Sequence, residues 1–354
     1  LSTMMDIPLS LTRILEYGAS VHGSTTVTTW HGEGTGSEFD PAEEVTFRDI
    51  AARAAAFAHA IHDDLGITGD ERVGSFMWNC AEHLEVMFGT ACKGAIFAPL
   101  NKQLMNDQIR HIINHAEISA IVCDPRLAQQ LGKVLVGTDS VKSVIITGAQ
   151  PAQQFAHLFP RGIEVYSYEA LIDGRSTVYD WPELDERTAA ALCYSTGTTG
   201  APKGVLYSHR SLYLEAMQLR SSDSLCITHG ETFLCCIPIC HVLSWGVPFT
   251  CFMTGTPLVL PDADVSAPTL AKAIAATSPR VAHGVPTIWI QLFVHYMHHP
   301  PERMTLTEIY AGGSPVPPTL IKMWEERYGV DVVHVWGMVE TSTVGSVARP
   351  PQGA

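Results

Sequence analysis

The chain has 354 residues, which is long for one hydrophobic core and sufficient for two packed substructures. Its 22 basic and 36 acidic residues give a net charge of −14, which argues against a nucleic-acid-binding protein and against a protein of anionic membranes. Only 16% of the residues are charged and 46% are hydrophobic, so we expect much of the chain to lie inside a sheet-and-helix assembly.

Two features bear on where the protein resides. The segment from Leu1 to Tyr17 carries Asp6, Arg13 and Glu16 within its apolar pattern, unlike a signal peptide, and no apolar stretch of the sequence reaches membrane-spanning length. The nine cysteines are odd in number and scattered, which fits a reducing compartment. We therefore expect a cytoplasmic protein.

Strand and helix patterns alternate along the first part of the chain. A helix is predicted over residues 45–61, begun by the capping pattern Thr46-Phe-Arg-Asp49 and ended near Gly66. The apolar periodicity then predicts strands at 73–77, 96–100, 120–123 and 143–146, with helices at 81–94 and 105–115. This alternation is typical of a mostly parallel sheet covered on both faces.

The same alternation returns after a short apolar strand at 189–193. Helices are predicted at 211–221, 241–253, 267–277, 286–297 and 318–328, and strands at 232–237, 257–260, 281–285 and around 309–311. The fold class expected is α/β, with two stacked, doubly wound, mostly parallel sheets and helices on both faces of each.

The most informative segment is residues 194–205, Tyr-Ser-Thr-Gly-Thr-Thr-Gly-Ala-Pro-Lys-Gly-Val. Its glycines allow left-handed backbone, its hydroxyls are donors and Lys203 adds a positive charge, which together suit a phosphate group. A flexible surface turn would use the same residue types. Pro202 and Gly204 on either side of Lys203 exclude a Walker A loop, and the glycine spacing excludes a dinucleotide fingerprint.

A second cluster combines Cys235, Cys236 and Cys240 with His241. A metal site is one interpretation. The run is apolar, however, and no second ligand pair follows at a zinc-like spacing, so buried structural thiols are favoured.

Residues 194–205 resemble, nearly residue for residue, the signature loop of the AMP-forming adenylating enzymes, the superfamily that includes acyl-CoA synthetases and luciferases. The usual Thr-Ser at its start is here Ser195-Thr196, which keeps both hydroxyls. The resemblance implies the large N-terminal domain of such an enzyme. It divides the chain into a segment 1–70 that packs on the second subdomain, an α/β subdomain 71–222 with the phosphate loop, and an α/β subdomain 223–354 with acyl and adenine motifs.

Three later motifs extend the resemblance. Residues 238–246 look like the substrate motif of fatty acyl-CoA ligases, in which the residue at His241 lines the acyl site and the one at Trp245 gates an apolar tunnel; alone, a helix-start histidine and a core tryptophan would explain both. Gly312-Gly313-Ser314 occupies the place that faces adenine and the acyl group. Residues 334–342 resemble the aromatic-Gly-x-Thr-Glu motif, with Val339 where the family usually has threonine.

The resemblance assigns roles to residues of this sequence as follows. The catalytic residues would be Lys203, His241 and Glu340. The nucleotide would be bound by Ser195, Thr196, Gly197, Thr198, Thr199, Gly200, Lys203, Gly313, Ser314, His334, Val335, Trp336, Gly337 and Val339. The acyl group would contact His241, Val242, Trp245, Gly312 and Gly313, and Mg²⁺ would be held by Ser195 and Glu340.

The implied activity is a fatty acid–CoA ligase of medium or long chain that uses ATP, Mg²⁺ and coenzyme A, with no nucleic-acid partner and with a homodimer as one expected assembly. A non-catalytic nucleotide- and acyl-binding homologue is one alternative, prompted by Val339. Another is an adenylating ligase for an aryl acid. The family has a further lysine on a C-terminal domain beyond the motifs seen here, so we expect these 354 residues alone to form no acyl-CoA.

Overall fold

The structure is a computed structural model that describes residues 2–32, 42–195 and 201–349. The chain forms two compact units, each assembled from three segments. Unit 1 contains Leu1–Tyr17, Ala51–Met77 and Leu84–Leu214, and unit 2 contains Gly18–Ile50, Trp78–His83 and Glu215–Ala354. The predicted domain limits at 70 and 222 follow the chain continuously, whereas residues 1–70 contribute to both compact units.

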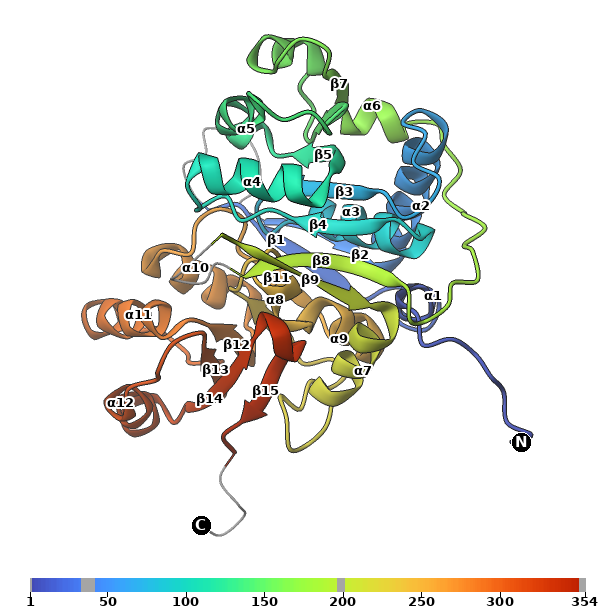
Figure 1. The fold of residues 1–354 in the computed structure, drawn as a ribbon. Coiled ribbons are helices and arrows are strands. Elements are labelled where there is room, and N and C mark those ends of the chain that lie inside the picture. The colour runs from blue at the N-terminus through green and yellow to red at the C-terminus, as the bar shows by residue number, and fades with distance from the viewer. Residues whose placement is uncertain (1, 33–41, 196–200, 350–354) are drawn as a thin grey trace. The chain divides into compact units, whose positions relative to one another are not determined.

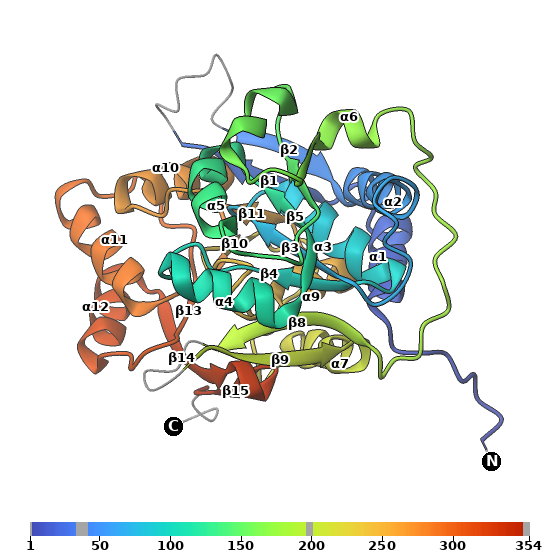
Figure 2. The ribbon, with the colours of Figure 1, turned by 45° about the horizontal axis from the view of Figure 1, so that its top comes forward.

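The sheet of unit 1 has the strand order β7-β6-β5-β3-β4-β8-β9. Its strands are β3 (Arg72–Phe76), β4 (Ile96–Pro99), β5 (Ile118–Cys123), β6 (Ser143–Ile146), β7 (Glu164–Ser167), β8 (Ala189–Ser195) and β9 (Lys203–Ser208). All neighbouring strands run parallel except β8 and β9, which form an antiparallel pair at one edge (Figure 2). The central strands are buried along their length, as expected for a parallel sheet covered on both faces.

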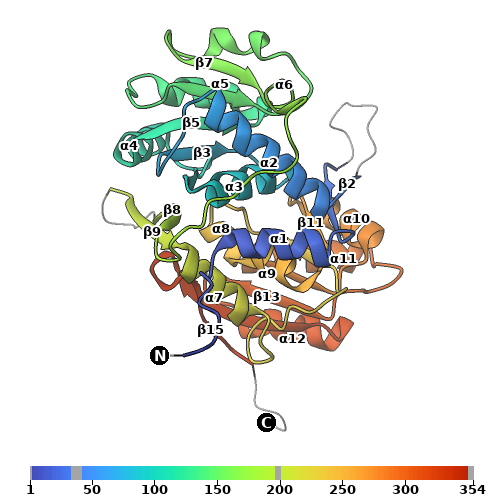
Figure 3. The ribbon, with the colours of Figure 1, turned by 90° about the vertical axis from the view of Figure 1, so that its right-hand side faces the viewer.

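The helices of this part of the chain are α1 (Leu11–Val21), α2 (Phe47–Asp63), α3 (Ala81–Lys93), α4 (Asn106–Ala116), α5 (Ala128–Leu135), α6 (Tyr168–Ile172) and α7 (His209–Leu219), with 3₁₀ turns at Pro125–Leu127, Ala152–Gln154 and Ala156–Leu158. Four of them, α2, α3, α4 and α7, correspond to the predicted ones, whereas α1, α5 and α6 were not predicted. The views in Figures 1 and 3 show α4 and α5 on the face of the sheet opposite α2 and α3. The predicted cap of α2 is confirmed, because the Thr46 amide donates to the Asp49 carboxylate at 2.9 Å and the Asp49 amide donates to Oγ1 of Thr46 at 3.2 Å.

The sheet of unit 2 has the strand order β15-β14-β13-β12-β10-β11-β1-β2. Its strands are β1 (Thr26–Trp30), β2 (Ala42–Thr46), β10 (Phe233–Cys235), β11 (Leu258–Leu260), β12 (Val281–Gly284), β13 (Glu308–Gly312), β14 (Asp331–Met338) and β15 (Thr343–Val347). The sheet is parallel except at its two edges, where β2 and β15 are antiparallel to their neighbours. The predicted α/β fold with two mostly parallel sheets is therefore confirmed.

The main core of unit 2 lies between this sheet and three helices, α10 (Ala267–Thr277), α11 (Pro286–His298) and α12 (Pro318–Tyr328). Alternate strand residues such as Ala282 and Ile309 face this core, and the fully buried indoles of Trp289 and Trp324 fill it. The helices begin with Pro at or near their first turn, where a missing N–H costs nothing. The strand residues of opposite parity, including His283, face the other side of the sheet.

The segment labelled α8 (Val242–Trp245), which is a short left-handed turn, and the helix α9 (Val247–Thr254) lie between β10 and β11 in the chain. A short 3₁₀ turn, η4 (Val339–Thr341), separates β14 from β15. Over the described parts of the chain, no helix combines the length and the apolar character that a bilayer crossing requires.

Candidate functional site

The predicted phosphate loop joins the two antiparallel strands of a hairpin in unit 1. Ser195 at the end of β8 pairs with Lys203 at the start of β9, and Tyr194 pairs with Gly204. Lys203 is exposed. The remaining predicted loop residues lie outside the described residues: Thr196, Gly197, Thr198, Thr199 and Gly200. Because the loop leads into a strand and not a helix, the exclusion of the Walker A and dinucleotide motifs agrees with the structure.

Unit 2 brings the later motifs together at the carboxyl ends of its parallel strands. Gly312 of β13 is the register partner of Val335 of β14, so Gly313-Ser314 and Trp336-Gly337 leave the same edge of the sheet. The strand order reverses at β10, whose neighbours are β11 on one side and β12 on the other. Open α/β sheets bind ligands outside the carboxyl ends of strands at such a reversal.

Gly312 sets how closely the motifs can approach one another. A Cβ atom at this position would lie 2.3 Å from the carbonyl oxygen of Val335 and 2.9 Å from Cη2 of Trp245. No side chain fits there. The absence of one allows the Trp245 indole, which is 8% exposed, to lie against the backbone of β13.

Trp336 presents an indole at the same edge. Its side chain is 52% exposed although it is large and apolar, and it lies over Gly345 of β15, where a Cβ atom would come within 2.6 Å of the ring. The neighbouring Val335 is buried and His334 is partly buried. The indole thus lies on the backbone of β15 at the carboxyl ends of the parallel strands, and its exposed face offers a flat surface on which a planar ring can stack.

The turn that follows carries the predicted carboxylate. Glu340 is exposed on η4, and Val339 is partly buried. The hydroxyl of Thr341 lies 3.0 Å from both the amide and the carbonyl oxygen of Met338, so it closes its own turn. The Thr341 hydroxyl is therefore engaged within its own turn.

The predicted helix over 241–253 is wrong at its first turn. His241 is exposed, and the next five residues all have positive φ: Val242 (40°), Leu243 (50°), Ser244 (56°), Trp245 (55°) and Gly246 (72°). Right-handed helix begins only at Val247, where Pro248 suits the first turn. Each non-glycine residue in left-handed conformation costs roughly 1–2 kcal/mol, so four in succession require strong compensating contacts.

Those contacts come from buried polar groups that the sequence did not single out. The Ser244 hydroxyl donates to the Ile237 carbonyl oxygen at 2.7 Å and lies 2.9 Å from Sγ of Cys235. His283 of β12, which is 0% exposed, lies with Nε2 3.1 Å from the Ser244 carbonyl oxygen. Its ring also meets the Trp245 indole edge to face, with centroids 5.3 Å apart. The sequence held one signal of this buried group, a histidine within the otherwise apolar strand Val-Ala-His-Gly.

Glu215 of α7 is a second buried group next to this turn. A Cβ atom at Gly246 would lie 2.8 Å from its carboxyl carbon, so glycine is needed there. Burial raises the pKa of Glu215 to about 8, an effect only partly offset by the nearby Thr343 hydroxyl and Val344 amide. Neither carboxyl oxygen makes a hydrogen bond of normal geometry within the described part of the chain. The carboxyl group is thus held neutral around pH 7.

The cysteine cluster is buried only in part. Cys235 and Cys236 are fully buried, and burial raises the pKa of both thiols, which disfavours the thiolate that binds metal ions. Cys240 is partly exposed. Among residues 2–32, 42–195 and 201–349, no group of three or more His, Cys, Asp or Glu side chains is placed to hold a metal ion.

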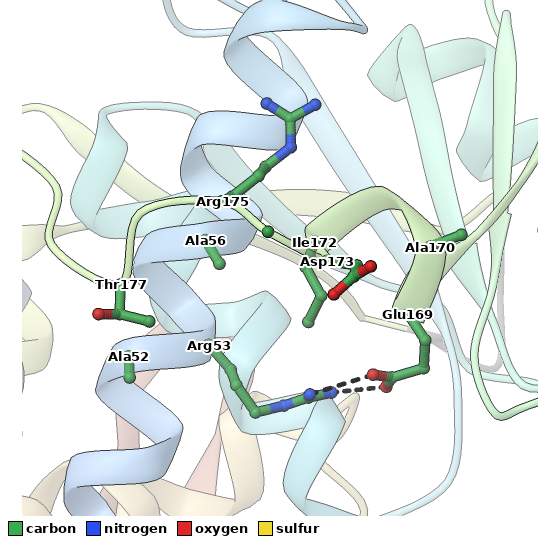
Figure 4. A pocket seen from close by; sticks show the side chains of 10 residues that line it. Ala52, Arg53, Ala56, Glu169, Ala170, Ile172, Asp173, Arg175 and Thr177 are labelled. Carbon is green, nitrogen blue, oxygen red and sulfur yellow. Dashed lines mark hydrogen bonds and ion pairs between the residues drawn. The ribbon is translucent and has the colours of Figure 1, made fainter.

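A cavity of about 490 Å³ in unit 1 contains none of the motif residues (Figure 4). It lies between α2 and the segment 169–177, and its charged lining residues are Arg53, Glu169, Asp173 and Arg175. The Arg53 guanidinium donates to both carboxylate oxygens of Glu169, at 2.6 and 3.1 Å, and to Glu85 at 2.8 Å. Its charge is balanced by these acids, so this cavity has the features of a structural ion-pair network.

Comparison with known proteins gives relatives over nearly the whole chain. The chain is 33% identical over 350 residues to 3-methylmercaptopropionyl-CoA ligase of Ruegeria lacuscaerulensis, covering 99% of this chain and 63% of that protein. It is 32% identical to medium-chain-fatty-acid–CoA ligase of Ectopseudomonas oleovorans, covering 99% and 62%. The chain thus spans less than two thirds of the length of these relatives.

Solved structures share the fold. An anthranilate CoA ligase in complex with anthranoyl-AMP matches with a TM-score of 0.84 at 22% identity, covering 98% of this chain and 63% of that one. A long-chain-fatty-acid-CoA ligase from Archaeoglobus fulgidus matches with a TM-score of 0.82 at 22% identity, covering 100% and 70%. The AMP-binding enzyme family matches residues 17–354. The chain belongs to the AMP-binding enzyme family.

Proposed function

We propose that the full-length protein activates a carboxylic acid with ATP and transfers it to coenzyme A. In the first step a carboxylate oxygen bonds to the α-phosphorus of ATP and the bond to the β-phosphate oxygen breaks, releasing pyrophosphate. In the second step the coenzyme A thiolate bonds to the acyl carbon, and AMP leaves with the former carboxylate oxygen. The observation that supports this most is the convergence of Gly312-Gly313, Trp336 and Trp245 at one sheet edge of an AMP-binding family member.

The nucleotide is proposed to lie on the exposed Trp336 ring, with adenine stacked on the indole and with Gly313 and Ser314 beside it. Ser195, Lys203 and the loop amides are proposed to meet the phosphates, where a positive charge and aligned donors stabilise the charge that develops on transfer. Gly337, next to Trp336 in the chain, is glycine for a packing reason: a side chain there would collide with the Thr343 carbonyl oxygen of β15.

Glu340 is proposed to bind Mg²⁺ together with the phosphates of the bound nucleotide. The ion usually takes one or two protein carboxylates, keeps waters and is otherwise held by substrate phosphates. Glu340 is an exposed carboxylate without a preformed acidic cluster among the described residues, which suits such a site. When bound, Mg²⁺ would neutralise phosphate charge.

The acid is proposed to be a fatty acid of medium or long chain, with its tail against Trp245, Val242 and Gly312. These groups are apolar, and Val242-Leu243-Ser244 offers no acidic partner for the ammonium of an amino acid. The relatives named for medium-chain fatty acids and for 3-methylmercaptopropionate both act on acids with largely apolar tails. His241, exposed at the start of the turn, is proposed to border the carboxylate end. A cytoplasmic location and a homodimer stay predictions.

The test is octanoate-dependent exchange of pyrophosphate into ATP by the full-length protein. Lys203→Met and Glu340→Gln are expected to lower kcat/KM for adenylation by on the order of 2–4 kcal/mol in transition-state free energy, while the order of preferred chain lengths stays unchanged. Lys322→Met, at an exposed lysine of α12, is the matched control and is expected to have no effect. A change in chain-length order with intact ATP kinetics would refute the assigned phosphate site.

Val339 favours one second candidate, a homologue that binds acyl-AMP without turnover. The two are separated by the same exchange assay combined with calorimetric titration of a non-hydrolysable acyl-AMP analogue. Binding without any exchange would support the non-catalytic homologue.

A further inference from the structure

Among the described residues, two buried strand side chains lie within hydrogen-bond distance of backbone carbonyls of the 242–246 turn: His283 of β12 at the Ser244 carbonyl, and Thr343 at the start of β15 at the Val242 carbonyl. His283 is the one that holds the middle of the turn, next to Trp245. It is a register partner of Cys235 in β10 and of Tyr310 in β13, so its Cα position is fixed by strands on both sides. Its side chain is 0% exposed and points to the face of the sheet opposite the main core. The strand therefore supplies a rigid anchor for a backbone that is unfavourable by itself.

The protonation pattern of His283 follows from its surroundings. Burial lowers its pKa to about 4, so the ring is neutral near pH 7 and carries one N–H. Nε2 faces the Ser244 carbonyl oxygen at 3.1 Å, which can only accept, and the Ser244 hydroxyl at 3.3 Å, which already donates to Ile237. The proton is therefore assigned to Nε2. Nδ1 is buried and has no hydrogen-bond partner among the described residues.

The same ring is the surface against which Trp245 packs. The indole lies edge to face on the imidazole at 5.3 Å, and the imidazole in turn meets Phe233 at 5.2 Å. If the turn leaves its left-handed conformation, the Ser244 carbonyl moves away from Nε2 and the Trp245 indole moves away from Gly312. The hydrogen bond and the position of the indole are thus coupled through one backbone segment.

We propose that His283 is the positioning residue that keeps the 242–246 turn, and with it Trp245, in the arrangement over Gly312, through the hydrogen bond from Nε2–H to the Ser244 carbonyl. The consequence for acid binding rests on the proposed function, because it requires that Trp245 borders the acyl site. In the gate role that the resemblance gives to Trp245, the indole over Gly312 closes the apolar tunnel until the nucleotide binds. A protein without this bond populates the displaced, open turn more often, so it binds the acid more readily before ATP arrives.

The test compares two replacements of similar size in the full-length protein. His283→Leu removes the donor, while His283→Gln places an amide N–H at about the reach of Nε2. Hydrogen exchange at the amides of Ser244 and Gly246, which donate within the turn, reports the turn directly and involves no ligand. We expect about three- to tenfold faster exchange in the Leu variant, the loss expected for one hydrogen bond, and near wild-type exchange in the Gln variant.

Equilibrium dialysis with radiolabelled octanoate, with and without a non-hydrolysable ATP analogue, reports the functional consequence. The Leu variant is expected to bind octanoate about three- to tenfold more tightly without nucleotide, with little change when the analogue is present, and kcat is expected to change less than KM. Trp245→Ala is expected to remove the dependence on nucleotide altogether. His283→Met serves as the donor-free variant if the Leu variant does not fold.

The outcomes separate the two claims. Equal exchange rates in the wild-type, Leu, Met and Gln proteins would overturn the positioning role of His283, whatever the enzyme does. Faster exchange in the donor-free variants, combined with unchanged octanoate binding in these variants and in Trp245→Ala, would keep the positioning role and refute the proposed acyl site.

Discussion

Glu215 provides a quantitative prediction, because its carboxyl group is fully buried and its pKa of about 8 differs strongly from the value of 4.5 expected for the unfolded chain. Between these two pH values the folded protein keeps a proton that the unfolded chain releases. The folded state is therefore destabilised as the pH rises through this window, the reverse of the usual behaviour of a salt-bridged carboxylate. The slope is about 1.4 kcal/mol per pH unit.

The perturbation is Glu215→Gln, which keeps the size of the side chain and removes the titration. We expect the free energy of unfolding of the wild-type chain, relative to that of the Gln variant, to fall by roughly 3 kcal/mol between pH 5 and pH 8. Groups shared by both proteins, such as His31 with its pKa raised to about 9 by Asp262 and Glu43, cancel in this difference if they act independently.

The assay is urea denaturation at pH 5, 6, 7 and 8, read by the fluorescence of the tryptophans. Infrared spectroscopy gives a second measurement, since the wild type should show a protonated carboxyl band that persists above pH 7 and that the Gln variant lacks. Glu325→Gln, at an exposed glutamate of α12, is the matched control. A difference between wild type and Glu215→Gln that stays constant from pH 5 to pH 8 would refute the reasoning.

Three further predictions concern other parts of the structure. Arg53→Leu removes the guanidinium partner of Glu85, whose side chain is 2% exposed, and is expected to lower the free energy of unfolding by about 3 kcal/mol; a loss below 1 kcal/mol in urea denaturation would contradict this. Gly312→Ala forces a Cβ atom to within 2.3 Å of a neighbouring carbonyl oxygen and should cost roughly 1–3 kcal/mol, while Gly69→Ala, with no contact under 3.6 Å, should be tolerated. Val339→Thr in the full-length protein should speed adenylation about tenfold or more with little change in melting temperature, and an unchanged or slower rate would show that another group serves that phosphate oxygen.

Most of the elements could be predicted because their signals are local. The helices at 267–277 and 318–328 have the predicted bounds, since proline near the start and a left-handed residue after the end define them within a few residues. The strands predicted at 143–146 and 96–100 are present as β6 and β4, because short apolar runs between turns mark them; β4 ends at Pro99. The family motifs were equally local, and the AMP-binding match over residues 17–354 confirms the family they indicate.

The features that were missed depend on tertiary structure. β1 lies beside β11, and their register partners are far apart in the sequence, so neither the strand nor its place in unit 2 could be predicted from periodicity. The left-handed turn at 242–246 was predicted as helix because four of its residues are not glycine, and only the buried partners of Ser244 make it stable. Glu215 gave no signal because an acid within a helix is usually exposed.

The most direct test of the proposed activity follows the carboxylate oxygen of the acid. Octanoate labelled with ¹⁸O in its carboxylate is incubated with ATP, Mg²⁺, coenzyme A and the full-length protein, and the nucleotide product is examined by mass spectrometry. The adenylation account predicts that one ¹⁸O atom appears in AMP for each thioester formed, and that Lys203→Met slows the appearance of both. Thioester formation with ¹⁸O in inorganic phosphate and ADP as the product would contradict it.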